Sequence, residues 1–520
     1  MKRFGIFACL AALLLGSAAC AGPEGQSGSV STAEGSTEDN TTAVADEPPV
    51  ALEFSGGAVW SDGTVAAEAG KIGVQNTAAF TPDRSEFRLT VSVLSAGKGS
   101  GAICFKSSAP DDGYRLVFSH TLHKVTLYVN DRGFLSWKSA KSADIREGVP
   151  FDVTLDFNGS NVKVSMGTAE DPADNLLFDL DCKPAGDLVI FDCGSLGGVS
   201  FSGIGISEVP QVAGATWCNP VIPKGIEGAD PFILCYGGKY YMYATNAAGE
   251  GYKVKVSEDL ANWTDLGFCL RDADVYGSPT ATAGFWAPEV YAVTREGKER
   301  FLMLYTVDEH VGAAFADSPE GPFRSEKNAY LIEGHKAIDA TLFTDDDGKS
   351  YIYYVGFGGV DYGIYCSEID LETLKTSSER RVLSPDGGSW ETREGSVTEG
   401  PAVLKHKGKY YLTYSGNGYT SKYYAIGYAV SDSPFGPFVK AKENPILEKT
   451  DDSGVFGPGH HGFFYTPGGH LMLAYHRHLD GSTVHPRSCC IDRVVFVDVG
   501  EDHDRLVIAG PTVTPQPIPD

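Results

Sequence analysis

The stretch Glu399–Gly418, EGPAVLKHKGKYYLTYSGNG, decides the fold because the chain repeats its pattern five times. It begins with an acidic residue beside glycine and proline and continues as an apolar run. It then turns at Gly408 and returns as an aromatic run. Two such runs on either side of a glycine turn are typical of a β-hairpin. The other four copies begin at Asp230, Trp286, Asp339 and His460.

The spacing of the five copies predicts a β-propeller over residues 213–520. The markers Asp230, Glu289, Asp339, Glu399 and His460 follow one another at 59, 50, 60 and 61 residues. Each interval holds about four short strands, which is the content of one blade. The first strand of every blade lines the central axis, so residues at the heads of these strands converge although they are far apart in sequence. We therefore expect five blades with a site at one mouth of the ring.

Residues 50–212 predict a second all-β unit. Runs such as FRLTVSVL and KVTLYVND alternate apolar and polar residues between turn signals, which favours a sandwich of two antiparallel sheets. The pattern resembles the jelly-roll or concanavalin-like domains often joined to secreted sugar-active enzymes. Four aromatic side chains are candidates for stacking on sugar rings or for the sandwich core: Trp60, Tyr114, Tyr128 and Trp137.

The N-terminus has the pattern of an export signal. Lys2 and Arg3 precede an apolar run and then small residues, and Cys20 resembles the acylated cysteine of a bacterial lipoprotein. Residues 1–20 are therefore expected to be a signal, and residues 21–49, rich in Gly, Ser, Thr and acidic residues, a disordered linker. We expect a secreted, cell-surface lipoprotein of a bacterium, held to the membrane through a lipid anchor only.

The net charge and the cysteine count limit the classes of binding partner and the cross-links to expect. The formal net charge of −26 disfavours nucleic acid and polyanionic sugars and is compatible with a neutral polysaccharide or oligosaccharide. Nine cysteines follow the signal, an odd number with no metal-type CxxC pair. We expect most of them to be free thiols, with one or two disulfides left open.

Three acidic residues head repeats. Asp230, Asp339 and Glu399 are interpreted as equivalent head residues of blades one, three and four, each among small or apolar neighbours. Partial burial among like charges separates carboxyl pKa values, so one acid stays protonated while its neighbour stays ionised. Glycoside hydrolysis uses such a pair, because one carboxylic acid protonates the leaving oxygen while a carboxylate activates water or attacks directly.

Five short motifs in order resemble those of glycoside hydrolase family 43. The resemblance covers about residues 215–500 and rests on the motifs ADP (Ala229–Pro231), WAPE (Trp286–Glu289), IDA (Ile338–Ala340), TEGP (Thr398–Pro401) and GPGHH (Gly457–His461). It implies a five-bladed propeller acting on glycans that contain arabinose, xylose or sometimes galactose, of arabinofuranosidase or xylosidase type.

The resemblance also implies roles. Asp230 would be the general base of an inverting mechanism and Glu399 the general acid, with Asp339 orienting Glu399 and raising its pKa. The two working carboxyls of such a site lie about 6.5–9.5 Å apart. Arg487 resembles an arginine that contacts the sugar in relatives. From their residue types, Phe285 and Trp286 are candidates for an apolar wall for a sugar ring or for packing near the axis. His460 matches a histidine that in many relatives faces a central Ca²⁺ or other ion, largely through water; the alternative is a structural histidine. No organic cofactor is expected.

Two other functions are weighed. A retaining fructoside hydrolase of related propeller type would carry NDPNG-like and RDP motifs, whereas this chain has GADPF and IDATL in their places. A non-catalytic glycan-binding lipoprotein would not require three clustered acids. The sequence does not choose the sugar, nor exo against endo cleavage.

Overall fold

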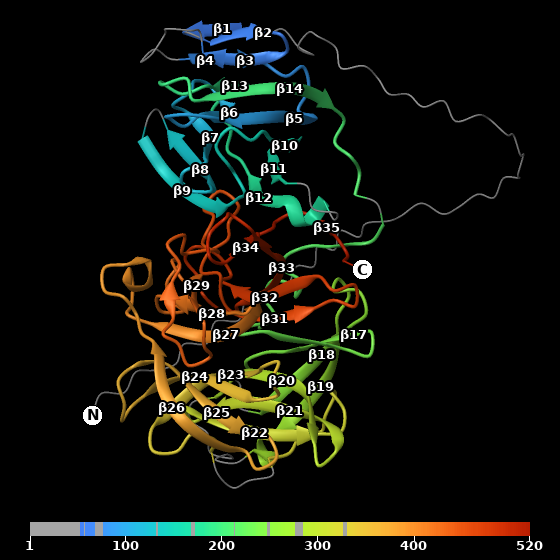
Figure 1. Ribbon diagram of the computed structural model, residues 1–520. Coiled ribbons are helices and arrows are strands. Elements are labelled where there is room, and N and C mark those ends of the chain that lie inside the picture. The colour runs from blue at the N-terminus through green and yellow to red at the C-terminus, as the bar shows by residue number, and fades with distance from the viewer. Residues whose placement is uncertain are drawn as a thin grey trace, which may run out of the picture. The chain divides into compact units, whose positions relative to one another are not determined.

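The computed structural model describes residues 53–519 except 57, 68–75, 132–133, 168–171, 213, 247–249, 276–283 and 326–329. The predicted signal (1–20) and linker (21–49) lie outside the described residues, and the domain boundaries stay predictions. The described part is all-β, as predicted, with a sandwich followed by a five-bladed propeller (Figure 1).

Two seven-stranded antiparallel sheets form the sandwich. The first has the order β1 (Glu53–Gly56), β4 (Asn76–Phe80), β13 (Leu188–Asp192), β6 (Ala102–Ser107), β7 (Gly113–Ser119), β8 (Lys124–Asp131) and β9 (Phe134–Ser142). The second has the order β12 (Leu176–Asp181), β11 (Asn161–Met166), β10 (Phe151–Asn158), β5 (Glu86–Ser95), β14 (Val199–Ser207), β3 (Thr64–Ala67) and β2 (Ala58–Ser61). A short 3₁₀ helix, η1 (Pro172–Asn175), precedes β12.

Alternation explains the sandwich. In β5, Phe87, Leu89, Val91 and Val93 are buried in one core shared by both sheets, while the residues between them are more exposed. Most of the aromatic residues considered for sugar stacking pack in or against this core. Tyr114 is buried against Phe105, and Trp60 and Trp137 pack against the core while only partly buried. Sugar binding by the sandwich stays a prediction.

Five small antiparallel sheets are the propeller blades. Blade one contains β16 (Phe232–Tyr236), β17 (Lys239–Tyr243), β18 (Gly251–Ser257) and β19 (Thr264–Arg271), and blade two β20 (Phe285–Arg295), β21 (Lys298–Val307) and β22 (His310–Ala316). Blade three contains β23 (Lys336–Thr344), β24 (Ser350–Phe357), β25 (Gly363–Asp370) and β26 (Lys375–Leu383). Blade four contains β27 (Thr398–His406), β28 (Lys409–Gly416), β29 (Ala425–Ser431) and β30 (Val439–Lys440), and blade five β31 (Gly459–Tyr465), β32 (Leu471–Arg477), β33 (Ser488–Val497) and β34 (Arg505–Ala509).

The first strands of the blades form a closed ring. β16 contacts β20, β20 contacts β23, β23 contacts β27, β27 contacts β31, and β31 returns to β16. At the ends of the propeller unit, β15 (Thr216–Trp217) pairs with β35 (Gln516–Pro517). Two 3₁₀ turns, η2 (Asp272–Asp274) and η3 (Trp390–Thr392), lie in the connections before blades two and four. The ring brings the repeat heads together, as the spacing predicted.

The cysteines that follow the predicted signal are all free thiols in the structure. Seven are buried, whereas Cys218 is exposed and Cys235 is partly exposed. Within the described ranges, no helix has the length and apolar character needed to cross a bilayer.

Candidate active site

The head of each inner strand contains one residue in the left-handed region of backbone conformation. The φ values are 50° at Asp230, 42° at Ala287, 57° at Asp339, 55° at Gly400 and 45° at His460. In blades two to five these residues lie inside a β-bulge, where the pairing with the second strand shifts register. The five heads thus share one backbone design although only three of them carry polar side chains.

This design corrects the predicted equivalence of the acids. The left-handed residue of blade four is Gly400 and that of blade two is Ala287, so Glu399 and Glu289 are not the counterparts of Asp230 and Asp339. Glu399 occupies the position before the left-handed residue, which Trp286 holds in blade two and Ile338 in blade three. The same bulge occurs in blades two, three and four, so residues are matched by their position in the bulge and not by their acidic side chains.

Four of the five strained head amides are capped by a side chain in, or just after, the second strand of the preceding blade. The N–H of Ala287 donates to Thr245 Oγ1 at 2.9 Å, that of Asp339 to Thr306 Oγ1 at 3.1 Å, and that of His460 to Ser415 Oγ at 2.8 Å. Asp230 N–H donates to His476 Nδ1 at 3.2 Å. These bonds help hold non-glycine residues in a conformation that is otherwise costly.

Blade four is the exception to this capping pattern. The corresponding residue of blade three is Val355, which pairs with Ile338 and has no hydroxyl. The N–H of Gly400 instead donates to Asp339 Oδ2 at 3.4 Å. A carboxyl side chain therefore replaces the hydroxyl cap next to Glu399.

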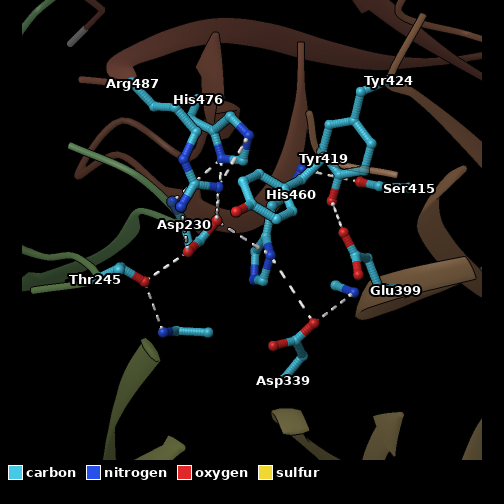
Figure 2. A network of polar contacts seen from close by, with 12 residues as sticks. Asp230, Thr245, Asp339, Glu399, Ser415, Tyr419, Tyr424, His460, His476 and Arg487 are labelled. Carbon is cyan, nitrogen blue, oxygen red and sulfur yellow. Dashed lines mark hydrogen bonds and ion pairs between the residues drawn. The ribbon is translucent and has the colours of Figure 1, made fainter. Parts of the chain in front are cut away.

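Asp230 is held as an ionised carboxylate. It is 8% exposed, and the Arg487 guanidinium binds it in a two-pronged contact, Nη1 to Oδ1 at 2.8 Å and Nη2 to Oδ2 at 3.2 Å (Figure 2). Thr245 Oγ1 donates to Oδ2 at 2.5 Å. Burial alone raises the pKa of Asp230, but Arg487, His460 and His476 together hold that pKa well below its usual range.

The pKa of Glu399 is shifted in the opposite direction from that of Asp230. It keeps part of its surface exposed, and its Oε1 accepts a 2.8 Å hydrogen bond from the hydroxyl of Tyr424. Burial of the carboxyl raises its pKa to about 7; the Tyr424 bond lowers that pKa and the negative charge of Asp230 raises it. Glu399 can therefore hold a proton near neutral pH while Asp230 stays charged.

Asp339 is also 8% exposed. Burial, together with the negative charges of Glu399 and Asp230, raises the pKa of Asp339 well above its usual range. The hydrogen bond from the amide of Gly400 acts in the other direction and lowers this pKa. The predicted role of Asp339 in orienting Glu399 and raising its pKa stays a prediction.

Phe285 does not form the predicted sugar wall. Its exposed fraction is 0%, and its ring packs edge-on against Tyr252 with the centroids 5.3 Å apart, in the core shared by blades one and two. The neighbouring Trp286 is partly exposed. Because successive side chains of an extended strand point in opposite directions, only one of this aromatic pair can face the axis.

His460 lies between two of the carboxyls of the cluster. His460 Nδ1 lies 3.3 Å from Asp230 Oδ1 and 4.0 Å from Asp339 Oδ2, and burial lowers its pKa. No group of three or more His, Cys, Asp or Glu side chains in the described part of the chain is arranged to hold a metal ion. The Ca²⁺ expected to face His460 stays a prediction.

The sequence did not identify several residues that complete the cluster. Thr245, Ser415 and His476 are polar residues that end aromatic runs, as in YAT, TYS and AYH, so a polar residue closing an otherwise apolar strand was a usable signal. Tyr424 and Tyr419 come from the connection between β28 and β29. Tyr419 is 41% exposed, and its ring lies 4.8 Å from the Arg487 guanidinium (Figure 2).

Comparison with known proteins adds a family match. The family described as glycosyl hydrolases family 43 matches residues 218–500. A beta-D-galactofuranosidase of Aspergillus niger is 29% identical over 54% of this chain and 83% of its own length. An arabinoxylan arabinofuranohydrolase of Paenibacillus polymyxa is 28% identical over 47% of this chain. A xylosidase/arabinosidase of Butyrivibrio fibrisolvens is 32% identical over 44% of it. The chain spans 44% of the length of each of the last two.

Solved structures give the same match. An endo-1,4-beta-xylanase of Bacteroides thetaiotaomicron is 36% identical, with a TM-score of 0.51 over 56% of this chain and 98% of that one. A thermostable family-43 glycoside hydrolase is 37% identical, with a TM-score of 0.52 over 59% of this chain and 99% of that one. Both matches span nearly the whole of the solved chain but little more than half of this one.

Proposed function

The chain belongs to glycosyl hydrolases family 43, a family of glycosidases, and we propose that it cleaves arabinofuranosyl or xylosyl linkages in plant polysaccharides with inversion of configuration. The observation that carries the mechanism is the contrast between two carboxyls in one cluster. Asp230 has a pKa well below its usual range, whereas the pKa of Glu399 is raised to about 7. Such a pair supplies a base and an acid at the same pH.

In the proposed reaction, Glu399 donates its proton to the glycosidic oxygen as the bond from that oxygen to the anomeric carbon breaks. A water molecule attacks the anomeric carbon from the opposite face and loses a proton to Asp230. The products are the free alcohol and a sugar with inverted anomeric configuration. Release of the proton from Asp230 to solvent and uptake of one by Glu399 restore the starting state.

Arg487 is assigned to Asp230 rather than to the sugar alone. Its two contacts fix both oxygens of the carboxylate, and the charge keeps Asp230 ionised. Trp286 and the exposed face of Tyr419 are the aromatic surfaces proposed to contact the sugar ring. Asp339 is proposed to anchor the backbone beside Glu399 through Gly400.

The sugar is proposed from the names of the relatives. Two of them are named for arabinofuranosyl or xylosyl substrates, and a neutral glycan agrees with the net charge of −26. The galactofuranosidase name favours a second candidate, a galactofuranoside, which has a five-membered ring like arabinofuranose. Attachment to a bacterial cell surface through Cys20 is a further proposal, supported by the pattern of residues 1–20.

A substrate panel tests the function. We expect turnover of nitrophenyl arabinofuranoside or xyloside, release of sugar from arabinoxylan or arabinan, and proton NMR signals of the inverted anomer in the first minutes. Activity on the galactofuranoside instead would favour the second candidate. Retained configuration would contradict the inverting mechanism and favour the fructosidase-like alternative, while binding to these glycans without turnover of any of them would favour a glycan-binding protein.

Asp339→Asn is expected to lower kcat/KM roughly 10-fold to 100-fold because the anchor beside Glu399 is weakened. Asparagine is neutral, and burial favours the neutral form of Asp339, so the basic limb of the pH profile should stay where it is in the wild type. A full pH profile of the variant checks this. A limb that moves to lower pH would instead show that Asp339 is ionised and raises the pKa of Glu399 by charge.

A further inference from the structure

We propose that Tyr424 is a positioning residue that determines which oxygen of Glu399 carries the catalytic proton. The inference rests on the proposed function, because it takes Glu399 as the proton donor. Tyr424 lies just before β29, outside the five repeat heads, and the hydrogen bond from its hydroxyl to Glu399 Oε1 is 2.8 Å long.

The tyrosine is fixed on every side. Its exposed fraction is 0%, and its N–H donates to the carbonyl of Ser421 at 3.0 Å. Blade five presses against the ring at Gly459, where an added Cβ would lie 2.3 Å from two ring carbons. The position of the hydroxyl is therefore set by packing between blades four and five.

The same ring lies against the surroundings of the base. Tyr424 stacks on His476, with the ring centroids 5.6 Å apart and the planes at 11°. His476 is fully buried, and its Nδ1 lies 3.1 Å from Asp230 Oδ1 (Figure 2). One stacked pair thus contacts the proposed acid on one side and the proposed base on the other, and this pair can hold the two carboxyls at a constant separation.

The hydrogen bond also assigns the proton. A protonated carboxyl holds its hydrogen on one oxygen, and Oε1 already accepts from Tyr424. The transferable proton of Glu399 then lies on Oε2, from which it passes to the glycosidic oxygen. The bond favours the charged form of Glu399 and opposes the effect of burial, so Tyr424 limits how far the pKa rises.

Tyr424→Phe keeps the ring on His476 and removes only the donor. We expect kcat/KM for an alkyl glycoside or xylo-oligosaccharide to fall on the order of 100-fold, with a much smaller loss for a dinitrophenyl glycoside, whose leaving group needs little protonation. KM should change little. The basic limb of the pH profile should move to higher pH, because the bond that favours the ionised form of Glu399 is lost.

The matched control is Tyr475→Phe. Tyr475 is also fully buried, and its hydroxyl donates to a buried carboxyl, Asp492 Oδ2, at 2.7 Å in blade five. The control should keep the wild-type pH limb and the wild-type dependence on the leaving group. If Tyr424→Phe lost the same factor in kcat/KM on both substrates and its basic limb did not move, the proposal would be overturned and Tyr424 would be a packing residue.

A second variant avoids the loss of the hydroxyl. Replacement of Tyr424 by 3,5-difluorotyrosine makes the phenol a stronger donor with nearly the same shape, so the basic limb should move to lower pH, opposite to Tyr424→Phe. No movement would contradict the proposal even if Tyr424→Phe failed to fold. Glu399→Gln distinguishes failure of the proposed function from failure of the inference about Tyr424. If Glu399→Gln stays fully active on alkyl glycosides, the proposed function itself fails. If Glu399→Gln is inactive but the basic limb does not move in the Tyr424 variants, only the role of Tyr424 is rejected.

Discussion

Asp230→Asn is expected to lower kcat/KM on the order of 10⁴-fold with every substrate, including those with activated leaving groups. The amide cannot accept the proton of the attacking water, and a better leaving group does not replace a base. Asparagine still offers an oxygen to Arg487 and Thr245, so the fold should survive better than with alanine, which would leave Arg487 buried without its partner. Initial rates together with circular dichroism and thermal unfolding check this.

The control for Asp230→Asn is Asp156→Asn in the sandwich. Asp156 is bound by Arg88 in the same two-pronged way, at 2.6 and 2.7 Å. Loss of this pair tests the cost of breaking such a contact away from the ring, and kcat/KM should stay within about twofold of the wild type. Wild-type turnover in Asp230→Asn, or an equal loss in the control, would contradict the assignment of Asp230 as the base.

Glu399→Gln is expected to lose on the order of 10⁴-fold in kcat/KM with alkyl glycosides and far less with dinitrophenyl glycosides. Glutamine cannot donate a catalytic proton, and only a poor leaving group requires one. In the wild type, activity should fall as the pH rises through the pKa of Glu399, about 7, since the protonated form is the active one. The basic limb should therefore disappear in the variant when an activated substrate is used.

Glu394→Gln is the matched control for Glu399→Gln. Glu394 lies five residues earlier, is exposed, and accepts a 2.7 Å hydrogen bond from Ser421 Oγ. It should keep both the wild-type rate and the basic limb. Loss of the limb in Glu394→Gln, or a Glu399→Gln variant that loses equally on every leaving group, would remove Glu399 from the role of acid.

The repeats predicted most of the fold because each unit has its own hydrophobic pattern and turn. Five strand pairs with a glycine turn at similar spacing leave few architectures other than a propeller, and the ring then places Asp230, Asp339 and Glu399 near one another. What the repeats did not predict was the bulge at the heads of blades two to five. The left-handed residues Asp339 and Gly400 are equivalent, so taking the acids as markers placed Glu399 one residue too early.

Residues without a repeated motif were harder to identify. Phe285 and Trp286 are adjacent aromatics, and sequence alone does not tell which one faces the core. Tyr424 lies among YTSKYYA, where three tyrosines are equally plausible. Its role depends on the pairing of blades four and five, which no local pattern encodes. The partner of Arg487 in the structure, Asp230, is 257 residues away in the sequence, so no local pattern pairs the two.

The amide caps at the strand heads have a consequence for how the catalytic centre can be divided. No described head residue is capped by its own blade: Thr245 of blade one caps Ala287 of blade two and also holds Asp230. An isolated blade would lose the cap on its own head as well as the neighbouring acids. The geometry of the proposed catalytic centre thus depends on the assembled ring. Fragments or circularly permuted chains would have to restore the contacts between neighbouring blades before the acids could take up their positions.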